Sequence, residues 1–422
     1  MSAPIPENPA LPERRDSTTD RLYDVGFFLV EAFAALEVTA VIVANARITA
    51  SLGLREELSS YIINSYLYPL FAVMLLITLL SRLVSRTLNP MYFFMAGLAL
   101  FAAGNVLCFA AASPLWFFAG RMVMGVGGAV SFAGQLWTLS IFHRWRITRT
   151  LIWGEAGAAL GVVAGPIVGA LFAQFSPEGW RDFFLLNAGL AVATALFACL
   201  GLWRREAPQV KEDAVKSDDP RGRSMIRTMT AWQVAVSILI VGSEYLFSDY
   251  LQAKMGKSPL FVGGMTVLAS AGAIMGSIWA ARQEKRMEQL PSRAAAGLLI
   301  SLAALAFCLS SRHFLLAGIP IFASGLCMGL ASVSIYASIV QASEPVQFLP
   351  RSMVYLMGMQ IGNAMGVQAV GLSEMWHLKV FPTAALVAAI PLAISLGILT
   401  YIRYVRTAQL SGNIPAFKES NP

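Results

Sequence analysis

The stretch DVGFFLVEAFAALEVTAVIVANA, residues 24–46, decides the class of fold, because it is apolar over nearly its whole length. A helix of about 20 such residues spans the roughly 30 Å hydrocarbon core of a bilayer. Eleven similar stretches follow it along the chain. The sequence therefore predicts an all-α integral membrane protein with 12 transmembrane helices, at residues 24–46, 61–81, 91–113, 115–142, 150–175, 182–203, 230–252, 259–281, 294–311, 314–340, 352–376 and 380–402.

The composition agrees with a membrane protein. Of 422 residues, 57% are hydrophobic and only 13% are charged, whereas a soluble domain has about 25% charged residues. Segments that cross the bilayer must satisfy their backbone groups internally, which favours a bundle of helices. The alternating pattern of about ten residues that is typical of outer-membrane barrels is absent.

The distribution of Lys and Arg predicts the orientation. With a cytoplasmic N-terminus, 23 of the 31 basic residues fall on the inner side, 7 fall on the outer side, and Arg121 lies within a span. This bias predicts cytoplasmic N- and C-termini in the cell (inner) membrane. A basic inner face beside anionic lipid accounts for the net charge of +7 without a nucleic-acid partner. Residues 1–22 lack the apolar core of a cleavable signal peptide, so we expect the first helix to act as an uncleaved anchor.

A polar segment divides the chain into equal halves. Residues 204–229 carry charges of both signs and are predicted to be a flexible cytoplasmic linker. Two six-helix bundles around a midplane site are typical of transporters, and the alternative is a membrane enzyme or receptor without internal symmetry. The predicted divisions are a tail (1–23), an N-terminal bundle (24–203), the linker (204–229), a C-terminal bundle (230–402) and a second tail (403–422).

Four motifs carry a resemblance to a known family. They are RMVMGVGGA at 121–129, GAALGVVAGPIVGA at 157–170, GWRDFFLLN at 179–187 and MQIGNAMGV at 359–367. In this order and spacing they resemble the major facilitator superfamily, specifically its drug:proton antiporter branch. The resemblance implies the major facilitator fold and alternating access. It also implies that the fifth helix, with Gly157, Gly161, Gly165, Pro166 and Gly169, meets the eighth helix and seals one side of the protein by turns.

Two positions depart from the family pattern. The loop after the second helix reads LLSRLVSRTLNP (79–90) and lacks the acidic residue of the family's gating motif. The Asp of the family's first helix is represented by Glu37, in LEVT. These departures leave open whether this loop gates the inner side by the Asp-based charge relay that the resemblance implies.

Charged residues within the spans are the candidates for proton coupling. A cation at a helix centre costs about 2.5–3.5 kcal/mol on insertion scales, so Arg121 needs a partner or water unless it snorkels to the surface. Glu37 reaches a similar depth, and the two are expected to pair or to share water, either for proton coupling or as a static ion pair. Glu244 has nearly the same offset in the seventh helix and is expected to face the same cavity from the other half. Glu31 is either a second, inner carboxylate or a neighbour of lipid headgroups.

A substrate cavity is predicted from small, aromatic and amide side chains. Gly125, Gly128, Phe132 and Gln135 follow Arg121 at helical spacing. Gln360 and Asn363 share a face of the eleventh helix, and Tyr336 of the tenth is expected to join them. Such a lining suits amphipathic organic ligands. The glycine stripe of the fifth helix is a surface that lets a neighbouring helix approach closely.

These observations predict a secondary active transporter that exports small amphipathic compounds, such as a drug, a siderophore or another metabolite, by proton antiport. The alternatives are a proton symporter or uniporter that imports a metabolite, or a receptor or enzyme. No metal-ligand spacing, nucleophile motif or phosphate-binding loop is present in the sequence, so we expect no enzymatic activity and no cofactor. The expected partners are the small-molecule substrate, protons and the lipid bilayer, and the protein is expected to work as a monomer.

Overall fold

The structure is a computed structural model, and it describes residues 18–80, 84, 88–142, 147–202, 220–283, 287, 289–341 and 348–410. Within these residues the chain is helical and contains no strand. The first half contributes α1 (Thr18–Ser51), α2 (Ser59–Leu79), α4 (Pro90–Ala110), α5 (Pro114–Phe142), α6 (Ile147–Phe175) and α7 (Trp180–Leu202). The second half contributes α8 (Pro220–Asp249), α9 (Pro259–Ala281), α10 (Leu290–Ser310), α11 (Gly318–Gln341), α12 (Phe348–Met375) and α13 (Val380–Leu410).

Eleven helices of the described chain are long and apolar enough to cross a membrane. The predicted helical class is thereby confirmed. The remaining long helix, α12, corresponds to the predicted span 352–376 but is less apolar, because it carries several polar residues: Arg351, Gln360, Asn363, Gln368 and Glu374.

The boundaries of several helices follow from local chemistry. Asn89 accepts a hydrogen bond from the backbone N–H of Met91 (2.9 Å), and Pro90 opens α4. Ser258 caps α9 in the same way before Pro259. A side-chain cap followed by proline is a favoured helix start, because proline lacks the N–H that would have no partner there. Gly53, just after α1, has φ of 62°, in the left-handed region that glycine enters without steric cost.

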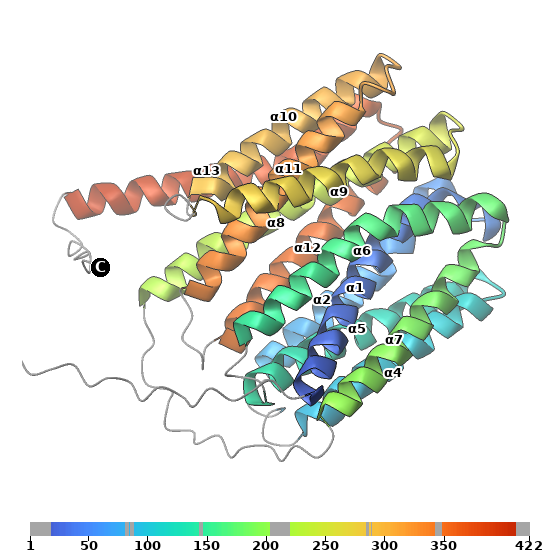
Figure 1. Cartoon of the computed structure of the whole chain (residues 1–422). Helices are drawn as coiled ribbons and strands as arrows, with labels where there is room; N and C mark the ends of the chain where they lie inside the picture. The colour runs from blue at the N-terminus through green and yellow to red at the C-terminus, as the bar shows by residue number, and fades with distance from the viewer. Residues whose placement is uncertain are drawn as a thin grey trace, which may run out of the picture.

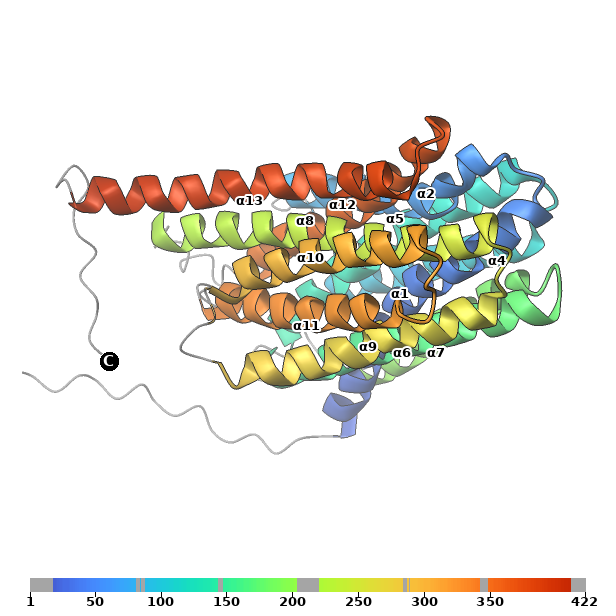
Figure 2. The same cartoon turned by 90° about the horizontal axis from the view of Figure 1, so that it is seen from above.

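The helices form two bundles, one from each half of the chain, as Figure 1 shows. The bundles meet mainly where α2 packs against α12 and where α6 packs against α9. The two halves are related by an approximate two-fold axis, so that α1 corresponds to α8, α2 to α9 and α6 to α12. The contact of α2 with α12 therefore corresponds to that of α9 with α6. Figure 2 shows α13 on the outside of the second bundle, with its end extending beyond α8.

The linker differs from its predicted extent. Residues 220–229 form the first turns of α8, because the helix begins at Pro220. Residues 204–219 lie outside the described residues. The predicted divisions of the chain otherwise stay predictions.

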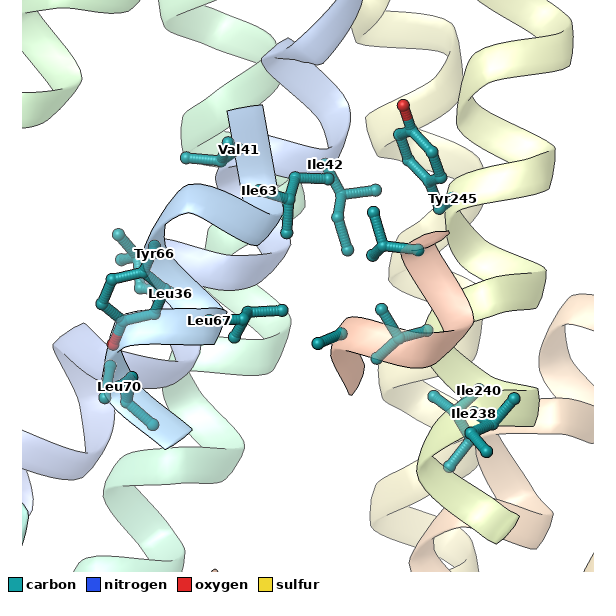
Figure 3. Packing of buried hydrophobic residues seen from close by; sticks show 14 of the residues in the cluster. Leu36, Val41, Ile42, Ile63, Tyr66, Leu67, Leu70, Ile238, Ile240 and Tyr245 are labelled. Atoms are coloured by element: carbon teal, nitrogen blue, oxygen red, sulfur yellow. The ribbon is translucent and has the colours of Figure 1, made fainter. Parts of the chain in front are cut away.

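Apolar side chains fill each bundle and the region where the bundles meet. Figure 3 shows Val41 and Ile42 of α1 and Ile63 of α2 on one side, with Tyr245 of α8 on the other. All four are nearly fully buried. We call the end of the molecule at which α1 finishes the Ser51 end, and the opposite end the Thr18 end. Because the helices alternate in direction, α2 and α9 begin at the Ser51 end, where α8 and α12 finish.

Candidate functional site

A buried ion pair lies at the centre of the first bundle. The guanidinium group of Arg121, on α5, donates from Nη1 to Oε1 of Glu37, on α1, and both side chains have 0% exposure. Nε of Arg121 donates to the carbonyl oxygen of Ile62 on α2 (2.9 Å). Asn187, on α7, donates from Nδ2 to the other carboxylate oxygen of Glu37 (2.7 Å). Four helices, α1, α2, α5 and α7, therefore meet at this ion pair.

Aromatic rings enclose the Arg121 side of this pair. The guanidinium carbon lies 5.1 Å from the ring centroid of Tyr66 and 5.8 Å from that of Phe184, within cation–π range. Nη2 of Arg121 is buried and has no hydrogen-bond partner among the described residues. In a site closed to solvent, a charged pair is strongly coupled, and loss of one charge leaves the other uncompensated.

Glu37 and Arg121 are paired in the structure. Within the described residues, the hydrogen-bond partners of Glu37 come from the first bundle, and a cavity that Glu37 shares with Glu244 stays a prediction. Glu244 is partly exposed, and within the part of the chain that the structure describes no hydrogen bond or ion pair reaches it. Its neighbour Tyr245 bonds to Asn45 and Ser59 of the first bundle, and Ser248 of α8 donates to the carbonyl oxygen of Ile42 (3.0 Å).

The remaining predicted residues of α5 lie along the same bundle interior. A side chain on Gly125 or Gly128 would run into α2, at Tyr66 and at Leu70. Phe132 is buried with 5% exposure. This face of α5 thus packs against α2 in the structure, and a role in lining a substrate cavity stays a prediction for these three residues.

Gln135 joins the second predicted carboxylate. Its Nε2 donates to Oε1 of Glu31 (3.1 Å), and its backbone carbonyl accepts a hydrogen bond from the hydroxyl of Tyr23 (3.1 Å). Glu31 and Gln135 thus tie α1 to α5 toward the Thr18 end.

The glycine stripe of α6 packs against α1. A Cβ added at any of its four glycines would lie too close to backbone or side-chain atoms of α1: near Phe28 for Gly157, Ala32 for Gly161, Thr39 for Gly165 and Ala40 for Gly169. The contact with α9, the eighth helix of the predicted order, uses the neighbouring face instead. There a Cβ on Gly263 would lie 2.5 Å from the carbonyl oxygen of Pro166, and Ser270 donates to the carbonyl of Val162 (3.0 Å).

The second bundle repeats this arrangement. Gly358, Gly362 and Gly366 of α12 follow one another at four-residue spacing and lie against α8. A side chain at Gly366, for example, would collide with the backbone of Gly242. Each bundle therefore has one glycine-lined helix pressed on its first helix, which fits the two-fold relation between the halves.

The polar residues predicted on α11 and α12 are only partly brought together. Nδ2 of Asn363 points to Oε1 of Gln360 at 3.4 Å, so the two amides share a face of α12. The ring of Tyr336, on α11, packs at a tilt of 51° against that of Tyr355, with centroids 5.8 Å apart. Tyr355 precedes Gln360 and Asn363 in α12 by one to two turns.

A network between the halves was not anticipated from the sequence. Asn45 donates to the hydroxyl of Tyr245 (2.9 Å), which lies 2.8 Å from Oγ of Ser59. Farther along α2, Asn64 and Tyr68 both donate to Oε1 of Gln368, at 3.0 and 2.9 Å. Single polar residues near the ends of spans have no distinctive sequence signal. Asn187, by contrast, belongs to the motif at 179–187, which is the signal that could have identified it as a partner of Glu37.

Comparison with known proteins supplies the context for this geometry. Residues 27–367 match the Major Facilitator Superfamily. The Methylenomycin A resistance protein of Bacillus subtilis (strain 168) is 28% identical over 169 residues, which are 39% of this chain and 34% of that protein. The MFS efflux transporter aclA of Aspergillus oryzae is 28% identical over 259 residues, which are 59% of this chain and 45% of that protein. The match therefore spans less than half the length of either relative.

Solved structures share the fold. A D-xylose–proton symporter superposes with a TM-score of 0.65 at 11% identity, covering 89% of this chain and 96% of that one. A bacterial homologue of the human lysosomal transporter Spinster, in an inward-facing and unoccupied conformation, gives a TM-score of 0.62 at 15% identity, covering 91% and 95%. At these identities the likeness concerns the fold alone.

Proposed function

Because this chain belongs to the Major Facilitator Superfamily, it is a membrane transporter, and we propose that it exports small amphipathic organic compounds in exchange for protons. Relatives named as resistance proteins and efflux transporters support export. The observation that carries proton coupling is the enclosed arrangement of Glu37, Arg121 and Asn187.

Proton binding at Glu37 has a clear physical consequence in this setting. An ionised Glu37 holds Arg121 and Asn187 on its two oxygens, so α1, α5 and α7 are drawn together. A protonated Glu37 loses most of its attraction for the guanidinium group, and Arg121 then needs another acceptor. Movement of α5 relative to α1 would provide one. Glu31, paired with Gln135, is proposed as a second carboxylate on the path of the proton from the Thr18 end.

For the orientation, we propose cytoplasmic termini in the cell membrane, with the Ser51 end outside. The Lys and Arg bias supports this arrangement. The hydrogen bonds that join Tyr245 and Gln368 to the first bundle lie toward the Ser51 end, which supports a state closed to the outside.

For the substrate, we propose a site between the bundles to which Glu244, Tyr336, Gln360 and Asn363 contribute. A carboxylate with no partner among the described residues, two amides and aromatic rings suit a molecule with a polar or cationic group on an apolar body. Each polypeptide is proposed to work as a monomer, with both bundles around one such site.

The test is transport into inside-out vesicles across a panel of amphipathic compounds, with an imposed acidic lumen. A proton-coupled exporter accumulates its substrate in the lumen only while the gradient lasts. Glu37→Gln should lose this uptake but still bind the substrate, measured by intrinsic Trp fluorescence. Asp182→Asn, an exposed carboxylate in the first turn of α7, is the control and should transport normally. Full gradient-driven uptake by Glu37→Gln would exclude the proposed coupling site.

A further inference from the structure

A chain of hydrogen bonds crosses between the two halves at the Ser51 end and terminates on a carboxyl group. Nδ2 of Asn45 donates to the hydroxyl of Tyr245, Tyr245 lies 2.8 Å from Ser59, and Ser59 donates to Oε2 of Glu374 (3.0 Å). An amide nitrogen only donates, and the Ser59 proton is used toward Glu374, so Tyr245 must donate to Ser59. The direction of every bond in this chain is therefore fixed. The four residues come alternately from α1, α8, α2 and α12.

The other carboxyl oxygen of Glu374 has an unusual environment. Oε1 is buried and receives no hydrogen bond from any described donor. The carboxyl group of Asp249, at the end of α8, lies within hydrogen-bonding reach of Glu374. Two ionised carboxylates cannot hydrogen-bond, because both are acceptors only. A single proton between them supplies the missing donor.

The surrounding charges do not replace that proton. The charged groups that act on the pair are Lys254, in η4 (Tyr250–Lys254), and Glu56, in η1 (Glu56–Leu58). Nζ of Lys254 is already paired with Oε2 of Glu56 (2.6 Å), another contact between the halves. Lys254 is the cation that acts on the pair within the described part of the chain, and it is largely neutralised by a third carboxylate.

We propose that Asp249 and Glu374 form a proton-operated latch that holds the Ser51 end closed. With one shared proton, the chain from Asn45 to Glu374 is satisfied and the halves stay joined. When the proton leaves to water, two like charges remain side by side and one buried oxygen has no donor, which disfavours the closed state. Opening of the Ser51 end hydrates both carboxylates, so the open state is favoured as pH rises.

This latch does not depend on what the protein carries or on Glu37. It gives the Ser51 end its own response to the pH on that side of the membrane. In an antiport cycle such a response would close the outside after a proton has arrived there.

The test measures the distance between the halves and needs no substrate. Spin labels are placed at Ser176→Cys, in the first half, and Leu315→Cys, in the second, both exposed at the Ser51 end. The partly exposed native cysteines are first replaced by alanine: Cys199, Cys308 and Cys327. Distances are then recorded by pulsed electron paramagnetic resonance in lipid nanodiscs from about pH 5 to about pH 9.

The wild-type distance should be short at low pH and lengthen as pH rises. Asp249→Asn and Glu374→Gln should both keep the short distance at every pH, because each amide donates the hydrogen bond that the shared proton otherwise provides. Asp182→Asn, an exposed carboxylate at the same end, should respond to pH as the wild type does. A wild-type distance that does not change with pH, or a response that survives in both amide variants, would overturn the latch.

Discussion

Arg121 binds Glu37 through its guanidinium group, and neither side chain has any exposed surface. Glu37 lies on α1 and Arg121 lies on α5, so the ion pair joins two helices that are also tied by the hydrogen bonds of Gln135 toward the Thr18 end. The remaining oxygen of Glu37 is occupied by Asn187. This buried pair holds helices of the bundle together. A proton on Glu37 would weaken its attraction for Arg121 and so change which helices attract each other.

The stability of the pair can be measured with a double-mutant cycle. Arg121→Met alone leaves Glu37 buried without a counter-charge, and we expect it to lower the free energy of unfolding by about 3–5 kcal/mol. The double variant Glu37→Leu with Arg121→Met should recover a large part of this loss, because no unpaired charge remains. Thermal unfolding in detergent measures both effects. Arg55→Met, whose pair with Glu57 is exposed, is the control and should unfold like the wild type. Additive effects at positions 37 and 121 would contradict a coupled pair.

Lysine should not replace Arg121. The guanidinium group reaches Glu37 and the Ile62 carbonyl at the same time and stacks near Tyr66. A point charge cannot copy this planar geometry. Arg121→Lys should therefore show little transport, and its residual activity should depend on pH differently from that of the wild type. The measurement is transport rate against pH in reconstituted vesicles, and superimposable profiles would remove Arg121 from the coupling site.

Gly165→Leu tests the contact between α6 and α1. A Cβ at this position already lies too close to Thr39, and overpacking of this kind costs about 1–3 kcal/mol. The variant should insert into the membrane but lose transport and unfold at a lower temperature. Gly189→Leu on α7 is the matched control, because nothing lies within 4 Å of its Cβ position. Normal turnover by Gly165→Leu would show that α6 and α1 need not approach so closely during the cycle.

Tyr245→Phe removes the middle of the hydrogen-bond chain between the halves. Asn45 and Ser59 each lose a partner, so the closed Ser51 end should be weakened by about 1 kcal/mol per hydrogen bond. The spin-label distance across that end should then lengthen even at low pH. Ser324→Ala, which loses only a bond to its own helix at Ile321, is the control. A closed end with wild-type distances in Tyr245→Phe would assign the closure to apolar packing instead.

The sequence predicted the fold well because the signals that define it are local. The length and apolarity of each stretch indicate a membrane helix without reference to its neighbours. The motif at 121–129 and the depth of Glu37 indicated that Glu37 and Arg121 lie at a similar depth, and the structure pairs them. The boundary at Pro220 was missed because a charged, polar helical turn resembles a linker in composition.

The sequence by itself determined that this chain is a helical membrane protein of one family and that a few charges lie within its spans. Only the tertiary structure decided what those charges and glycines face. Gly165 lies against α1, Glu37 is closed inside one bundle, and Glu374 meets Asp249 and Ser59. The reason is physical: burial of a helix in a bilayer depends on its own residues, whereas the partner of each face depends on how all the helices pack together.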